Sequence, residues 1–258
     1  MERDSAILAV EFEAAIFDLD GTLADTHQDI ADAMNRVLRR RRLPIHGPAS
    51  YTLMIGEGLH NLVGQALPRE KRTEATIAAC LEEMVAEYGE HCLDKTRLYD
   101  GVAELTRALR ADGVGLAVLS NKADELTRRI VAALFDCGTF AQVVGARPGR
   151  PLKPDPTAAL FVGDRLGVLA ARIAYLGDSG IDMRTATAAG MLAVGVWGAF
   201  VRPTNSSRTA PAWSWTTRWT CLSCAARPAG GSPAGGSPAT AETRRARLPR
   251  AAGRETPA

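Results

Sequence analysis

The chain has 258 residues, 46% of them hydrophobic and 23% charged, a composition that indicates a globular protein of one large or two small domains. No apolar run is long enough to span a bilayer, and the mixed charges at the N-terminus disfavour a signal peptide, so we expect no membrane partner. The five cysteines lack regular spacing, which predicts free thiols in a reducing cytoplasm. Cys221 and Cys224 form a single CxxC motif without the second pair that a zinc ribbon needs, so we interpret it as a chance occurrence.

The net charge of +2 hides an uneven distribution. Residues 201–258 carry nine arginines and two acids, whereas the preceding 200 residues carry a net charge of −5. A basic tail can bind nucleic acid. This tail lacks lysine and is rich in Gly and Pro, so we expect no nucleic-acid partner. The sequence leaves open whether the protein is a monomer or a homodimer.

The first predicted element is a buried strand over residues 12–18, which runs directly into Asp18 and Asp20. Residues two apart in an extended backbone point to the same side. Gly21 permits a sharp turn, and Thr22 offers a hydroxyl and an N–H. Two such carboxylates can hold a hard cation, and one can attack an electrophile. A surface loop would explain the turn, but not the apolar run that ends in paired acids.

A helical segment is expected next. From Thr26 to about Arg41 the apolar residues recur at helical spacing, and Thr26 is a candidate N-cap. Residues 50–93 predict further helices without a strand, interrupted at Gly56 and Gly58. The histidines share no spacing typical of a metal site, and we interpret all four as ordinary polar positions: His27, His46, His60 and His91.

Beyond Gly101 the predicted helices alternate with strands that are apolar throughout. This pattern is typical of a parallel sheet covered by helices on both faces, which binds ligands at the carboxyl ends of its strands. The predicted helices cover 102–111, 123–135, 155–169 and 181–190, and the predicted strands cover 115–119, 142–145, 173–176 and 192–197.

Polar residues follow four of the predicted strands, and we expect them to share one site. They are Asp18 and Asp20, Ser120 and Asn121, Lys153, and Asp178 with Asp182. This set suits phosphoryl transfer with Mg²⁺, because carboxylates hold the metal, a lysine and a hydroxyl neutralise phosphoryl oxygens, and one aspartate attacks. Taken singly, Lys153 would be a solvated lysine, Ser120 a helix N-cap, and Asp182 a cap of the 181–190 helix.

In their order and spacing, these four motifs resemble those of haloacid dehalogenase (HAD) superfamily phosphatases, over roughly residues 12–200. The resemblance implies an α/β fold with a doubly wound parallel sheet, a HAD-like Rossmannoid core, and an inserted α-helical cap. The expected core comprises residues 1–24 and 95–203, and the expected cap residues 25–94.

The resemblance also implies catalytic roles. Asp18 is the nucleophile that forms an aspartyl-phosphate, and Asp20 protonates the leaving alcohol and then accepts a proton from water. Ser120 donates a hydrogen bond to a phosphoryl oxygen, and Lys153 offsets negative charge. The dehalogenases of the family lack the second acid of the first motif, so Asp20 favours phosphate esters over carbon–halogen bonds.

The implied cofactor is Mg²⁺, held by Asp18, the backbone carbonyl of Asp20, and Asp178. Asp182 either helps to hold the metal or lies just beyond its direct ligands. Asp182 could also cap the 181–190 helix, either instead of serving the site or in addition to it, and the sequence leaves these alternatives open.

The segment around Asp25, Asp29 and Gly56-Glu57-Gly58 resembles the phosphoglycolate phosphatase branch. The implied partner is a small phosphorylated metabolite, 2-phosphoglycolate, bound by Thr22, Asn121, Gly56 and Gly58 with help from an Arg or Lys of the cap. The glycines would otherwise merely end cap helices. The alternatives are another small-molecule phosphatase, a pyrophosphatase, a β-phosphoglucomutase, or a protein that keeps the fold with impaired catalysis.

The resemblance stops after about Arg202, and residues 225–258 have a composition typical of disorder. Reverse translation of residues 204–224 with GC-rich codons, read one frame over, yields a helix, an apolar valine run and an Asp-Pro turn like those of relatives. We therefore interpret 204–258 as a frameshifted, largely disordered tail. Such a tail leaves every catalytic residue in place, but predicts lower stability and aggregation through Trp213, Trp215 and Trp219.

Overall fold

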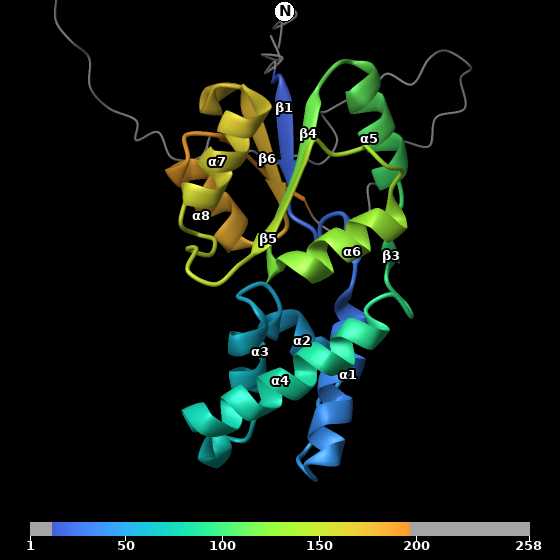
Figure 1. Cartoon of the computed structure of the whole chain (residues 1–258), viewed down its shortest axis with the longest axis vertical. Helices are drawn as coiled ribbons and strands as arrows, with labels where there is room; N and C mark the ends of the chain where they lie inside the picture. Colours follow the sequence, from blue (N-terminus) through green and yellow to red (C-terminus); the bar gives the residue numbers. More distant parts are fainter. Residues whose placement is uncertain (1–11, 197–258) are drawn as a thin grey trace, which may run out of the picture. The chain divides into compact units, whose positions relative to one another are not determined.

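A five-stranded parallel sheet, ordered β5-β4-β1-β6-β7, forms the centre of the computed structural model, which describes residues 12–196 (Figure 1). The prediction of a parallel sheet is therefore confirmed. The strands are β1 (Ala14–Phe17), β4 (Gly115–Ala123), β5 (Gln142–Ala146), β6 (Ile173–Gly177) and β7 (Leu192–Gly195). The predicted tail, including its tryptophans, Cys221 and Cys224, lies outside the described residues.

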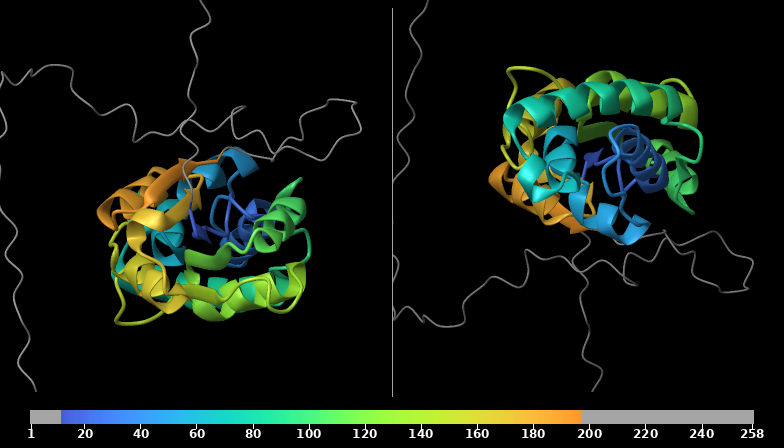
Figure 2. Two further views of the ribbon diagram at one scale, coloured as in Figure 1. Left: turned by 90° about the horizontal axis from the view of Figure 1, so that it is seen from above. Right: turned by 90° about the horizontal axis from the view of Figure 1, so that it is seen from below.

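Helices cover both faces of the sheet, as Figure 2 shows from above and below. The side chains of β1 alternate: Ala15 and Phe17 join the core under α5 and α6, whereas Ala14 and Ile16 join the core under α7 and α8. This double burial explains why the strand is apolar throughout. The bounds are α5 (Val102–Ala111), α6 (Asp124–Leu134), α7 (Thr157–Leu166) and α8 (Gly180–Ala188).

A second group of helices is inserted between two short strands. The strands β2 (Ala24–Asp25) and β3 (Arg97–Leu98) pair antiparallel, so the chain leaves and re-enters the sheet-bearing part at neighbouring points. Neither strand was predicted, because two residues are too few to show alternation. The inserted helices are α1 (His27–Arg40), α2 (Pro48–Met54), α3 (Leu59–Ala66) and α4 (Glu74–His91), with a 3₁₀ turn at Arg69–Lys71.

Two local predictions need correction. Thr26 does precede α1, but its hydroxyl makes no capping bond and donates instead to Oδ1 of Asp20, at 2.5 Å. Strand β4 does not stop at Leu119 but continues to Ala123, and its register with β5 shifts between these two residues. The first difference brings the Thr26 hydroxyl to Asp20, just after β1, and the second includes Ser120, Asn121 and Lys122 in β4.

The described cysteines are free thiols: Cys80, Cys92 and Cys137. Within residues 12–196 no helix has both the length and the apolar character needed to cross a bilayer. The described part of the chain thus agrees with the predicted thiol state, and it offers no membrane-spanning element.

Candidate active site

Three carboxylates converge where β1 and β6 end. Asp18 follows β1, Asp178 follows the neighbouring β6, and Asp182 lies in the first turn of α8. One oxygen from each lies within 4.8 Å of the others. Among the described residues, these three carboxylates form the one cluster of at least three potential metal ligands, and no histidine belongs to it.

Lys153 enters this cluster from the loop between β5 and α7. Its Nζ lies 2.8 Å from Oδ1 of Asp18 and 2.7 Å from Oδ1 of Asp182, and its side chain is buried. Three carboxylates facing one ammonium leave two formal negative charges in a buried volume. A divalent cation with oxygen ligands would match that charge and that donor set.

The pKa values of Asp18 and Asp178 also favour a cation at this site. Burial raises the pKa of Asp18 to about 7, and the neighbouring Asp182 and Asp20 add to this rise, while Lys153 opposes it. Burial and Asp182 also raise the pKa of Asp178. Each of these carboxyl groups would ionise more readily beside a cation, so the residues present fit a hard divalent metal ion.

Gly21 and Thr22 set the position of Asp178. Gly21 has a φ of +82°, and a Cβ built on it would lie 2.3 Å from Oδ2 of Asp178, so only glycine fits. The Thr22 hydroxyl donates to Oδ1 of Asp178 at 3.1 Å, and its N–H donates to the Leu19 carbonyl. Both donors of Thr22 thus help to shape the loop, and its predicted role in binding substrate stays a prediction.

Both oxygens of Asp182 are engaged within the protein. Oδ1 pairs with Lys153, and Oδ2 accepts bonds from the N–H and the hydroxyl of Ser179 at 3.1 and 2.5 Å. Ser179 in turn accepts from the Asp182 N–H, which completes a capping box at the start of α8. Asp182 therefore caps the helix and holds Lys153 at the same time. Direct contact of Asp182 with a metal stays a prediction.

Asp20 is held by two partners that the sequence analysis did not assign to the site. Its Oδ1 accepts from the Thr26 hydroxyl and lies 2.9 Å from Nζ of Lys122. Lys122 also donates to the hydroxyl of Tyr88 in α4, at 2.9 Å. The available signal was the position of Lys122 directly after Ser120 and Asn121, at the end of an apolar strand.

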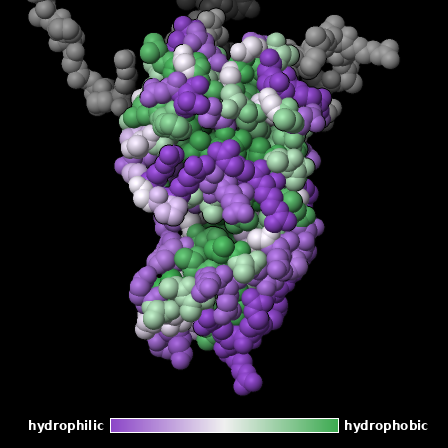
Figure 3. Space-filling view, viewed as in Figure 1, coloured by the Kyte–Doolittle hydropathy of each residue, from purple (hydrophilic) through white to green (hydrophobic). Residues whose placement is uncertain are grey.

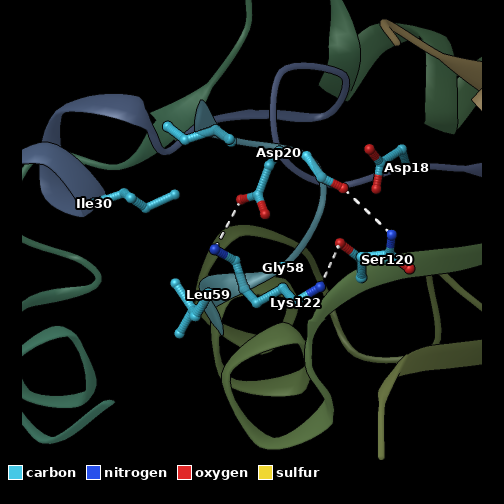
Figure 4. Close-up of a pocket in the computed structure, with 10 residues that line it drawn as sticks. Asp18, Asp20, Ile30, Gly58, Leu59, Ser120 and Lys122 are labelled. Atoms are coloured by element: carbon cyan, nitrogen blue, oxygen red, sulfur yellow. Dashed lines mark hydrogen bonds and ion pairs between the residues drawn. The ribbon is translucent and has the colours of Figure 1, made fainter. Parts of the chain in front are cut away.

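A pocket opens beside these groups (Figure 4). It brings together most of the predicted substrate-binding residues and adds an apolar wall. Its lining comprises Asp18, Asp20, Ile30, Ile55, Gly56, Gly58, Leu59, Ser120, Asn121 and Lys122. In the space-filling view, hydrophobic side chains reach the surface between the inserted helices and the strand-bearing part (Figure 3).

The predicted Arg or Lys from the inserted helices is not among the lining residues. The cation in the pocket is Lys122, which comes from β4. Asn121 lines the pocket, and its side-chain amide also donates to the carbonyls of Gly56 and Lys153 and accepts from the Lys153 N–H. Asn121 therefore fixes the Gly56 turn and the lysine loop, so any contact with substrate comes in addition to this structural role.

Comparison with known proteins identifies the family to which the chain belongs. The family model for haloacid dehalogenase-like hydrolases matches residues 15–196, so the chain belongs to this family. More particularly, the chain is phosphoglycolate phosphatase-like. It is 31% identical to the phosphoglycolate phosphatase of Salmonella choleraesuis over 199 residues, 70% of this chain and 79% of the relative. For that of Chromobacterium violaceum the identity is 32% over 188 residues, 71% and 84% of the two chains.

Solved structures agree. A predicted phosphoglycolate phosphatase from Haemophilus somnus superposes with a TM-score of 0.67 at 29% identity, covering 73% of this chain and 87% of that one. A β-phosphoglucomutase from Clostridium difficile has a TM-score of 0.61 at 18% identity, covering 71% and 84% of the two chains. At that identity the second likeness concerns the fold alone.

Proposed function

We propose that the protein is a Mg²⁺-dependent phosphomonoester hydrolase that converts 2-phosphoglycolate to glycolate and phosphate. The observation that carries the proposal is the placement of Asp18 and Asp20 at the end of β1, both lining one pocket with Ser120. Two adjacent carboxylates can divide the work of nucleophile and acid. The names of the curated relatives support the choice of substrate.

In the proposed reaction, a carboxylate oxygen of Asp18 forms a bond to phosphorus as the phosphorus–oxygen ester bond breaks. The leaving oxygen takes its proton from Asp20. A water molecule then attacks the phosphorus of the aspartyl-phosphate and gives a proton to Asp20, which releases phosphate and restores Asp18. The state of both carboxyl groups is thus the same before and after the cycle.

The surrounding residues serve charge and orientation in this proposal. Lys153 pairs with Asp18 and would offset charge on the phosphoryl group, and the Ser120 hydroxyl would donate to a phosphoryl oxygen. Asp18, Asp178 and the backbone carbonyl of Asp20 would hold Mg²⁺, which supplies further positive charge to the phosphoryl oxygens. Asp182 acts through Lys153, since their ion pair is buried.

The inserted helices are proposed to act as a cap over the leaving group. Within the described residues they contribute one wall of the pocket through Ile30, Ile55, Gly56, Gly58 and Leu59. The antiparallel β2–β3 pair, at the two ends of the inserted segment, supports our division into a proposed cap, residues 25–94, and a proposed core, residues 1–24 and 95–203. A cap at this place would select the leaving group and exclude water.

Phosphate release from a small panel tests the proposal. The panel contains 2-phosphoglycolate, β-glucose-1-phosphate and pyrophosphate, each with and without Mg²⁺, and compares the wild type with Asp18→Asn. We expect turnover that needs Mg²⁺, favours 2-phosphoglycolate, and falls at least about 10³-fold in the variant. Preference for another substrate would reject 2-phosphoglycolate but retain the mechanism. No turnover by folded wild-type protein would favour the catalytically impaired alternative.

A further inference from the structure

Lys122 occupies an unusual position for a lysine. Its side chain is only 2% exposed, yet it carries a charge into the pocket wall. Lysine is rarely buried unless it is paired, so its position calls for a specific partner. Asp20 supplies that partner, at 2.9 Å from Nζ. Burial alone would lower the pKa of Lys122, but Asp20 and Tyr88 raise it above its usual value, so the side chain is an ammonium ion.

The irregularity of β4 explains how this side chain reaches the pocket. In a regular strand, successive side chains point to opposite faces. Here the register with β5 shifts between Leu119 and Ala123, and three consecutive residues line the pocket: Ser120, Asn121 and Lys122. The Lys122 N–H also contacts the Ser120 hydroxyl oxygen at 3.3 Å. The backbone that presents Ser120 to the site therefore presents Lys122 as well.

The contacts to Asp20 are asymmetric. The Thr26 hydroxyl and the Lys122 ammonium both meet Oδ1 (Figure 4 shows the ion pair). Two donors on one oxygen fix the rotation of the carboxyl group and keep a proton off that oxygen. The proton that a general acid delivers must then sit on Oδ2. The same contacts thus decide which atom of Asp20 faces a leaving group.

Tyr88 connects this arrangement to the inserted helices. Its side chain in α4 is fully buried, and its hydroxyl accepts a bond from Lys122 at 2.9 Å. The Lys122 Nζ lies 4.6 Å from the centre of the Tyr88 ring. Burial raises the pKa of Tyr88 to about 12, so its hydroxyl stays protonated. Lys122 therefore joins β4, the loop after β1, and α4 through one ammonium group.

We propose that Lys122 is a positioning residue for the general acid, holding Oδ1 of Asp20 so that Oδ2 delivers the proton, with Tyr88 fixing the lysine from α4. This inference rests on the proposed phosphatase function. Lys122 forms no bond with the reacting atoms in this role. Its removal should therefore slow formation of the aspartyl-phosphate only to the extent that the leaving group needs a proton.

The test compares substrates that differ in this need. Glycolate leaves 2-phosphoglycolate as a basic alkoxide, whereas p-nitrophenol leaves p-nitrophenyl phosphate as a stable anion. We expect Lys122→Met to lower the single-turnover rate of aspartyl-phosphate formation from 2-phosphoglycolate by about 10²-fold, but the same rate from p-nitrophenyl phosphate by less than about fivefold. The later hydrolysis, in which Asp20 accepts a proton from water, is common to both substrates and is left out of this comparison. KM should change little for either substrate. Asp20→Asn should give the same selective pattern in aspartyl-phosphate formation, since it removes the acid itself, and should also slow the shared hydrolysis step.

Two further variants complete the design. Lys71→Met removes an exposed lysine remote from the pocket lining and should leave both rates unchanged. Tyr88→Phe keeps the buried ring but removes one partner of Lys122, and it should shift the ratio of the two rates in the same direction by a smaller factor. If Lys122→Met does not fold, the ratio measured for Tyr88→Phe decides the question.

Different results would reject the positioning role of Lys122 and the proposed phosphatase function. Equal losses on both substrates would show that Lys122 only stabilises the fold, and an unchanged ratio in both Lys122→Met and Tyr88→Phe would show that neither positions the acid. By contrast, a wild type without Mg²⁺-dependent phosphatase activity, or an unaffected Asp18→Asn, would reject the proposed function itself.

Discussion

Gly21 is the residue whose missing side chain matters most to the proposed metal site. A Cβ at this position would collide with Asp178, so Gly21→Ala should displace that carboxylate. Gly113 is a matched control, because its φ of +79° is similar but nothing lies within 4 Å of a Cβ built on it. Both variants share the cost of an alanine at positive φ, about 1–2 kcal/mol.

The two glycine variants should differ in their dependence on Mg²⁺. We expect the Mg²⁺ concentration for half-maximal activity to rise at least about tenfold in Gly21→Ala and to stay unchanged in Gly113→Ala. Titration of activity with Mg²⁺ measures this, and thermal melting reports the shared loss of stability. An equal Mg²⁺ requirement in the two variants would mean that Asp178 does not hold the metal.

At the level of elements, Asp124 joins α6 to β5. Its Oδ1 accepts the Gly145 N–H at 2.9 Å, and its Oδ2 pairs with Arg128 and Arg147 at 2.8 and 2.7 Å. Burial opposes ionisation, but the hydrogen bonds from Arg147 and Arg128 outweigh it and lower the pKa of Asp124 to about 2. The stabilisation is therefore present above the ordinary pKa and fades as the pH falls from about 4 toward 2.

Asp124→Asn should lower the free energy of unfolding by about 1 kcal/mol at pH 7, since both arginines are half exposed and solvent screens their charge. The difference from wild type should shrink below pH 4, where the unfolded chain is protonated. Urea unfolding at pH 7 and pH 3.5 measures both values. Asp136→Asn, at an exposed acid, should change stability by less than about 0.5 kcal/mol. A difference that persists or grows at pH 3.5 would contradict the assigned role of Asp124.

The elements show what a sequence can and cannot reveal. Strands buried on both faces and amphipathic helices leave long periodic signals, so the sheet and α5 were predicted closely. The β2–β3 pair was too short to leave one. The Asp18 and Asp178 positions followed from neighbouring strand ends, whereas the bond from Thr26 to Asp20 and the path of Lys122 depend on tertiary packing and a register shift. No local pattern encodes such contacts.

At the scale of the whole molecule, the site draws on segments far apart in the chain. Asp20 pairs with Lys122, and Lys153 pairs with Asp18 and Asp182, because the parallel sheet aligns the carboxyl ends of β1, β4, β5 and β6. The inserted helices complete the pocket from the other side. The proposed catalysis therefore depends on the folded arrangement of both parts, and it requires Asp18 to carry the phosphoryl group during the reaction.

Trapping the aspartyl-phosphate on Asp18 is the direct test of this requirement. The wild type and Asp18→Asn are mixed with 2-phosphoglycolate and Mg²⁺, quenched in acid within a single turnover, and digested for mass spectrometry of the peptide that contains Asp18. We expect a peptide heavier by one phosphoryl group, with the modification on Asp18 in the wild type and absent from the variant. Turnover without any phosphorylated peptide across the time course, or a phosphoryl group on another residue, would contradict it.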